Sequence, residues 1–150
     1  ISSLFVHTFF CMFIFIAFAL NGYLPNIYNI QILYYLICLF VLIVSISFIT
    51  SSIIIFFKDF GQIVSIVLQI GMWFTPIMWS YKMLPKKYEF IFKLNPMFYI
   101  VEGYRDSFIN KVWFFEKPNL TLLFWIITIV LFLVGAYLFK KLKPHFSDVL

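Results

Sequence analysis

Residues 95–108 read Asn-Pro-Met-Phe-Tyr-Ile-Val-Glu-Gly-Tyr-Arg-Asp-Ser-Phe, a polar stretch inside a very apolar chain. Asn95 suits the capping position of a helix and Pro96 suits the first helical position, so a helix is predicted to begin here. Of the 150 residues, 64% are hydrophobic and 11% are charged. Soluble domains carry about 25% charged residues, so this composition predicts an integral membrane protein.

Three charged side chains share one face of the predicted helix, because Glu102 lies three residues before Arg105 and four before Asp106. Gly103 has no side chain and is expected to let another backbone approach closely. Charges beside membrane spans are costly unless they are paired, hydrated or functional. Arg105 favours two ionised carboxylates in a structural ion-pair cluster over an acid–base pair for catalysis.

The apolar runs predict an all-α integral membrane protein with a single transmembrane domain over residues 1–150. A helix needs about 20 apolar residues to cross a bilayer, and four segments approach or exceed that length. They are predicted as spans at residues 3–21, 30–57, 61–80 and 120–139. The segment at residues 84–110 contains no such run, and it is interpreted as a pair of short helices that do not span.

The third predicted span carries a polar stripe, because its polar and indole side chains recur at steps of three and four residues. The stripe consists of Gln62, Ser65, Gln69 and Trp73. Polar side chains at membrane depth face protein or water. Two interpretations remain open: the stripe lines a polar passage, or it makes hydrogen bonds between helices. A proline at position 76 is expected to kink this helix near its end.

Other polar residues within the spans have structural interpretations. Ser47 and Ser51 form a small-xxx-small pair that suits close helix packing. Cys11 and Cys38 are isolated from acids and from each other, so buried thiols are expected rather than a disulfide. No Cys/His cluster has metal-ligand spacing, and no metal site is predicted.

Several short motifs together resemble the C-terminal half of type 2 ABC exporter permeases, in particular the branch that exports wall teichoic acid and other lipid-linked polysaccharides. They are Thr-Pro-Ile-Met-Trp-Ser at 75–80, Leu-Pro at 84–85, Asn-Pro at 95–96 and Glu-Gly-Tyr-Arg-Asp at 102–106. The resemblance implies that the chain is the C-terminal portion of a six-span permease about twice as long. It also implies that the two short helices form a re-entrant hairpin at the exit of the transport pathway.

The resemblance also implies the partners and the location. Two permease copies would form a homodimer around a central pathway in the bacterial plasma membrane, surrounded by membrane lipid. Separate ATP-binding subunits would hold ATP and Mg, with Lys58 and Asp59 in a cytoplasmic loop near them. The cargo would be a lipid-linked glycan polymer. Aromatic side chains near the exit either contact its sugars or form an interfacial belt, namely Trp79, Tyr81, Tyr99 and Tyr104.

The sequence also excludes several functions. It contains no G-x-x-x-x-G-K-[ST] phosphate loop and no G-x-S-x-G elbow, so the chain is predicted to be a pore subunit rather than an enzyme, without a cofactor of its own. The net charge of +5 comes from lysines in loops, which does not indicate nucleic-acid binding. Two alternatives remain: an ABC permease for a drug or lipid, and a membrane scaffold without a transport role.

Overall fold

The computed structural model describes residues 2–22, 26–57, 59–75 and 86–144, and these residues contain helices and no strand. The predicted all-α class is therefore confirmed for this part of the chain. The longer helices are α1 (Ser2–Leu20), α2 (Gln31–Ile54), α3 (Phe60–Phe74), α4 (Lys86–Lys93), α5 (Pro96–Arg105) and α6 (Pro118–Leu142). Short helical turns are η1 (Ile27–Ile30), the π-helical η3 (Asp106–Asn110) and η4 (Phe114–Glu116).

Within the described parts of the chain, two helices are long and apolar enough to cross a membrane. They are Ile27–Ile54, which joins η1 and α2 over 28 residues, and the 25-residue α6. Both overlap predicted spans, with boundaries that differ by a few residues. Shorter apolar helices are present at Thr8–Leu20 within α1 and at α3.

Helix α3 lies within the third predicted span and ends at Phe74 after 15 residues. A helix of that length extends about 22 Å, which is less than the roughly 30 Å hydrocarbon core of a bilayer. Thr75 already has extended backbone angles, with φ −92° and ψ 125°. A residue that precedes proline avoids helical geometry, so the proline at position 76 stops the helix here. Residues 76–80 lie outside the described residues.

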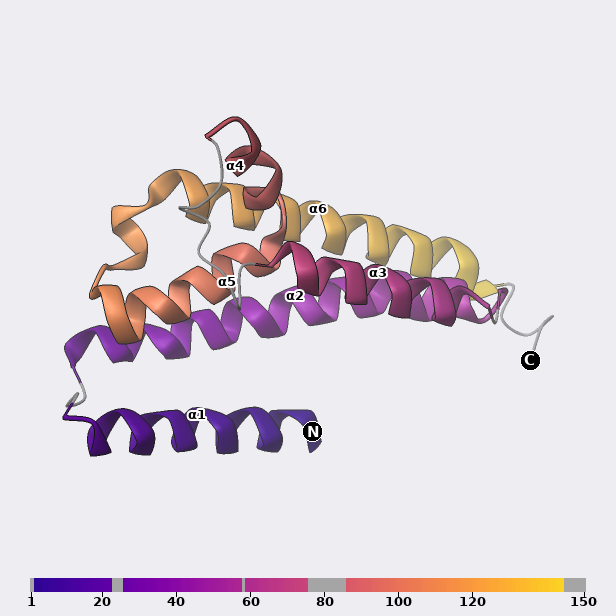
Figure 1. Cartoon of the computed structure of the whole chain (residues 1–150). Coiled ribbons are helices and arrows are strands. Elements are labelled where there is room, and N and C mark those ends of the chain that lie inside the picture. Colours follow the sequence, from indigo (N-terminus) through magenta and orange to yellow (C-terminus); the bar gives the residue numbers. More distant parts are fainter. Residues whose placement is uncertain (1, 23–25, 58, 76–85, 145–150) are drawn as a thin grey trace.

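Helices α2 and α6 lie side by side along most of their length (Figure 1). Gly135 of α6 allows this close packing. A Cβ atom at Gly135 would lie 2.9 Å from Cβ of Phe48 and 3.2 Å from the backbone nitrogen of Ile49, both in α2. Any larger residue at position 135 would therefore push the two helices apart.

In α2, the serines that pack against other helices are not the pair that the sequence predicted. Ser47 and Ser51 are exposed, whereas Ser45 and Ser52 are fully buried. Each buried hydroxyl donates a hydrogen bond of 2.6–2.7 Å to the carbonyl four residues earlier in α2. The prediction was wrong because α2 is apolar all round, and its sequence does not mark the face that meets another helix.

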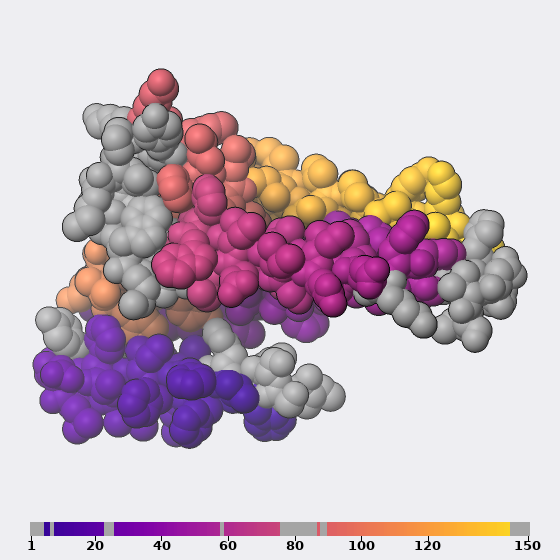
Figure 2. Space-filling view, turned by 45° about the vertical axis from the view of Figure 1, so that its right-hand side comes forward, coloured from indigo at the N-terminus to yellow at the C-terminus, as the bar shows by residue number. Residues whose placement is uncertain are grey.

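Helices α3 and α5 lie end to end against α2, α3 along its C-terminal half and α5 along its N-terminal half (Figure 1). Helix α5 closes a core between α2 and α6 that includes Tyr35, Leu42, Ile100 and Phe124. Helix α1, indigo in Figure 2, lies alongside this group. Its Phe15 and Phe18 rings contact the Phe108 ring of η3, with centroids 5.1 and 5.4 Å apart.

Candidate functional site

Asn95 occupies the junction between α3 and α5. Its side-chain Oδ1 accepts a hydrogen bond from the Met97 backbone N–H at 3.0 Å, which caps the N-terminus of α5. The predicted helix start is thus confirmed, with a proline at the first position. The Asn95 Nδ2 donates in the opposite direction, to Thr75 Oγ1 at 3.0 Å and to the Gly71 carbonyl at 3.3 Å. One amide side chain therefore bonds to the adjoining ends of both helices.

Hydroxyl and indole groups join α2, α5 and α6 at the other side of α5. The Tyr34 and Tyr99 hydroxyls are 3.3 Å apart, and Tyr99 lies 3.0 Å from Thr121 Oγ1. The Trp125 indole donates to the Tyr34 hydroxyl at 3.0 Å. Tyr99 is only 5% exposed, and its hydroxyl is held inside this network. The Tyr99 hydroxyl thus takes part in packing between helices, a role that the sequence analysis did not predict for it.

Gly103 faces the Tyr35 ring of α2. A Cβ atom at position 103 would overlap ring atoms of Tyr35, so glycine is required at this contact. The close approach expected at Gly103 therefore involves an aromatic ring rather than a second backbone. The buried Ser107 hydroxyl donates to the Gly103 carbonyl at 2.7 Å and holds the next turn in place.

Glu102 and Arg105 form the expected pair, with Arg105 Nη1 3.4 Å from Glu102 Oε2. The Glu102 side chain is 7% exposed and that of Arg105 is 26% exposed. Burial raises the pKa of Glu102, and the nearby Asp106 charge raises it further, although Lys117 and Arg105 act in the opposite direction. Desolvation and repulsion thus exceed the attraction of the two cations, so the pair does not offset the cost of burying Glu102.

Asp106 is paired with a residue that the sequence did not indicate. Its carboxylate contacts the Lys117 ammonium, and Asp106 Oδ1 accepts a hydrogen bond of 2.9 Å from Asn110 Nδ2. Asp106 is 3% exposed. After η3, Lys111 has a left-handed conformation (φ 57°), and the chain turns so that Lys117 returns to Asp106. The ion pair closes the loop between α5 and α6.

Gln31 holds the same loop from the opposite side. Its Nε2 donates to the Val112 carbonyl at 2.8 Å, and its Oε1 accepts from the Phe114 backbone N–H at 3.0 Å. Gln31 is 3% exposed at the first position of α2. Sequence analysis did not single out this residue. The available signal was a lone amide at the start of an uncharged span, where a buried polar group requires a partner.

The polar stripe of α3 faces outward in this structure. Its residues are all exposed, and Trp73 is 74% exposed. Ser65 donates to the Gly61 carbonyl of its own helix at 3.0 Å. Among the described residues, Gln62 and Gln69 make no hydrogen bond to another helix, so the helix-bonding interpretation finds no support within this part of the chain.

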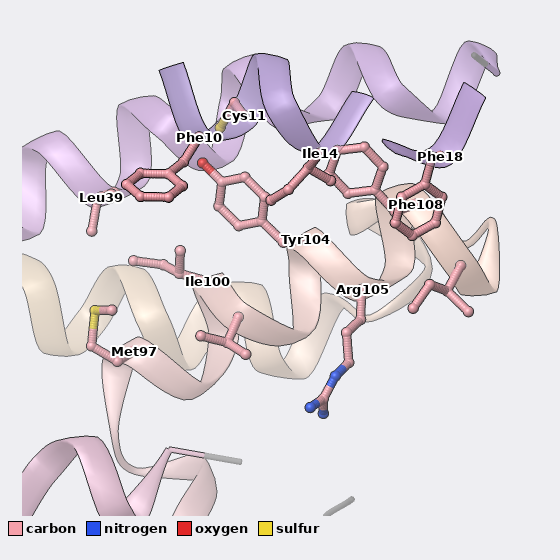
Figure 3. Close-up of a pocket in the computed structure, with 12 residues that line it drawn as sticks. Phe10, Cys11, Ile14, Phe18, Leu39, Met97, Ile100, Tyr104, Arg105 and Phe108 are labelled. Atoms are coloured by element: carbon pink, nitrogen blue, oxygen red, sulfur yellow. The ribbon is translucent and has the colours of Figure 1, made fainter. Parts of the chain in front are cut away.

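The remaining predicted residues lie in different places. Tyr104 and Arg105 line an apolar cavity of about 510 Å³ between α1, α2 and α5. Figure 3 shows Tyr104 directed toward α1 and Arg105 directed away from it. Asp59 precedes α3 and makes no side-chain cap bond. Three residues of the prediction lie outside the described residues, namely Lys58, Trp79 and Tyr81.

The sequence was compared with the models of known protein families. Residues 1–109 match the family model for ABC-2 type transporters. The chain belongs to the ABC-2 type transporter family. The family-level part of the sequence prediction is therefore confirmed. The matched region includes α1 to α5 and the Glu102–Asp106 motif, but it ends before Lys117, the partner of Asp106.

Two curated relatives of this ABC-2 chain are O-antigen export system permease proteins RfbA from Klebsiella pneumoniae. They are 31% and 30% identical to it over 105 residues. Each alignment covers 70% of this chain and 39% of the relative. The chain thus spans about two fifths of the length of the curated relatives it matches. Their printed names describe permeases for O-antigen export.

Proposed function

We propose that this chain forms part of the membrane permease of an ABC exporter, and that the exporter moves a lipid-linked polysaccharide across the bacterial plasma membrane. The observation that carries the proposal is the ABC-2 family match, joined to relatives named as O-antigen export permeases. In this proposal the chain contributes a passage and supplies no catalytic group of its own.

The exposed polar stripe on α3 supports a polar passage. Helix α3 is otherwise apolar, and its outward-facing glutamines are Gln62 and Gln69. Lipid does not satisfy amide groups, so these side chains require protein or water beside them. A hydroxyl-rich polymer in a hydrated passage would meet that requirement. We therefore assign this face of α3, including Ser65 and Trp73, to the passage.

The proposed exporter needs partners that supply energy and complete the passage. We propose two permease copies around one passage, with separate subunits that bind ATP and Mg and hydrolyse ATP at the cytoplasmic side. The loop that contains Lys58 and Asp59 would lie beside those subunits. Segment 84–110 would be the re-entrant hairpin at the opposite end. The complete layout would comprise four spans and this hairpin.

The finer substrate assignment is a polymer of the teichoic acid type, based on the short motifs at 75–80 and 102–106. The relatives named for O-antigen export favour a lipid-linked glycan in the broader sense. Both polymers combine a lipid anchor with a long hydrophilic chain, so the same kind of passage serves either. A drug or simple lipid would lack the long hydrophilic part.

Purification of the full permease with its ATP-binding subunit tests the proposal. We expect mass spectrometry to find a lipid-linked glycan in the purified complex and ATP hydrolysis to rise when that glycan is added. A complex whose ATP-binding subunit cannot hydrolyse ATP provides the control for export in cells. Co-purification and stimulation by a small drug or a simple lipid, without glycan export, would contradict the proposal. A permease that associates with no ATP-binding subunit would favour the scaffold.

A further inference from the structure

We infer that Asn95 is a positioning residue that couples α3 to α5, so that the two helices move together during export. The inference rests on the proposed function, because it assigns a mechanical role within that exporter. It depends on one geometric fact: the two halves of a single amide side chain bond to the facing ends of two helices. Neither the family match nor the relatives assign a role to this residue.

The helix ends at this junction expose backbone groups that need partners. The Thr75 backbone N–H bonds to the Met72 carbonyl at 3.1 Å, in the tighter three-residue pattern, which leaves the Gly71 carbonyl without that donor. The Gly71 oxygen instead accepts from Thr75 Oγ1 at 2.8 Å and from Asn95 Nδ2 at 3.3 Å. Unpaired helix-end groups are costly at membrane depth, so Asn95 stabilises this end of α3 as well as the start of α5.

The contacts of α3 make this connection important for motion. Helix α3 packs against α2, and its other side carries the exposed polar stripe. Among the described residues, the bonds from Asn95 are the side-chain hydrogen bonds that join α3 to another helix. Nineteen residues separate Thr75 from Asn95 along the chain. The amide therefore supplies a much shorter connection between the two helices than the backbone does.

Helix α5 is held firmly at its other contacts. Tyr99 bonds into the network between α2 and α6, and Gly103 contacts the Tyr35 ring. A displacement of α3 along α2 would therefore reach segment 84–110 through Asn95. If ATP-driven movement enters at the Asp59 end of α3, loss of this connection separates ATP hydrolysis from export.

Two substitutions weaken or remove the connection and preserve the start of α5. Asn95→Ser retains an oxygen that caps α5 and lacks the amide donor to Gly71. Thr75→Val retains the side-chain shape but lacks the hydroxyl that accepts from Asn95, so it removes the 3.0 Å bond and leaves the longer bond from Asn95 to the Gly71 carbonyl. Thr75→Ser keeps that hydroxyl and serves as the conservative variant. Asn21→Ser is a matched control, because among the described residues the Asn21 amide bonds only to the Ala17 carbonyl of its own helix, at 2.8 Å.

The test uses the full permease, its ATP-binding subunit and export in membrane vesicles. We expect Thr75→Val to reduce glycan export per hydrolysed ATP by about fivefold, the factor that corresponds to one net hydrogen bond. Asn95→Ser, which removes both bonds, should reduce it at least as much. The double variant should lose no more than Asn95→Ser alone, because Asn95→Ser has already removed the bond that Thr75→Val removes. Thr75→Ser and Asn21→Ser should keep the original ratio. The stacked Phe74 and Phe92 rings, with centroids 5.3 Å apart, remain in every variant and support assembly.

A second measurement does not depend on export. In a complex without native cysteines, Met97→Cys is labelled with a thiol reagent, with and without a non-hydrolysable ATP analogue. We expect the analogue to change the labelling rate in the parent complex and to have no effect when Asn95→Ser is added. An unchanged export ratio in Asn95→Ser, or the same nucleotide response with and without Asn95, would overturn the coupling. A parent complex that exports no glycan but shows the Asn95-dependent response would instead overturn the proposed substrate and leave the coupling supported.

Discussion

The group formed by α2, α5 and α6 differs from α3 in how it accommodates polar side chains. In the first region, buried polar side chains such as those of Gln31, Tyr99 and Asp106 are paired within the chain. In α3, Gln62 and Gln69 face outward. The polar groups of the first region therefore find their hydrogen-bond and ion-pair partners within the chain, and these contacts stabilise the fold. The second leaves its glutamines exposed, so that water or another molecule would have to bond to them, which is consistent with the proposed passage.

The largest effect is expected when Asp106 loses its cation. Lys117→Met should destabilise the permease by about 3 kcal/mol, because it leaves a buried carboxylate without its charged partner. Unfolding of the purified full-length permease in mixed detergent micelles measures this change. Asp106→Asn with Lys117→Met should recover much of the loss, since neither charge then remains. If the double variant loses as much as the sum of the two single variants, the pair does not act as the structure indicates.

A smaller loss is expected when the contact between α5 and α2 is crowded. Gly103→Ala should cost about 1–3 kcal/mol, because its methyl group would overlap the Tyr35 ring and force a shift. Gly71→Ala is the matched control, since no heavy atom lies within 4 Å of a Cβ built at Gly71. The same unfolding measurement compares the two variants. Equal stability of both would show that the ring moves aside without cost.

Two threonines of α6 test, within the α2–α5–α6 group, whether a buried hydroxyl stabilises the protein only when it is hydrogen-bonded. Thr121 bonds to Tyr99 and to the carbonyls of Phe114 and Lys117, at 3.0–3.2 Å. Among the described buried side chains, the Thr128 hydroxyl has no hydrogen-bond partner. Thr121→Val should cost about 1 kcal/mol, a typical value for polar contacts between membrane helices. Thr128→Val should be neutral or stabilising, because it removes a buried hydroxyl without breaking a bond. A reversed order in unfolding experiments would contradict this assignment.

Sequence patterns predicted the features that depend on local spacing or on apolar length. The N-cap at Asn95 follows from Asn-Pro, and the contact of Glu102 with Arg105 follows from the pitch of a helix. The two long helices were predicted from long uncharged runs, because in lipid the backbone groups of such a run are satisfied within a helix. These signals lie within one segment and require no knowledge of the packing partner.

Features that depend on tertiary packing were not predicted. Lys117 reaches Asp106 because a π-helical turn and a left-handed residue reverse the chain, and neither has a clear sequence signature. The choice of Ser45 and Ser52 over their neighbours was also missed. In lipid the outward and inward faces of a helix are both apolar, so hydrophobic periodicity does not identify the packed face. Tyr99 was assigned to the exit by residue type, whereas its burial follows from the network around it.

Substitutions in the polar stripe of α3 are expected to change stability least and to change transport clearly. Gln69→Leu should change the free energy of unfolding by no more than about 0.5 kcal/mol, because its side chain is exposed and bonds to no other described helix. It should nevertheless slow polymer export, since an apolar side chain in a hydrated passage removes hydrogen-bond partners from water and from sugar hydroxyls. Leu68→Gln, next to it and also exposed, tests the reverse change on a neighbouring position. Export by vesicles and unfolding of the same preparation are measured together. A Gln69→Leu complex that loses stability but exports normally would show that the stripe packs against another helix, and would remove α3 from the passage.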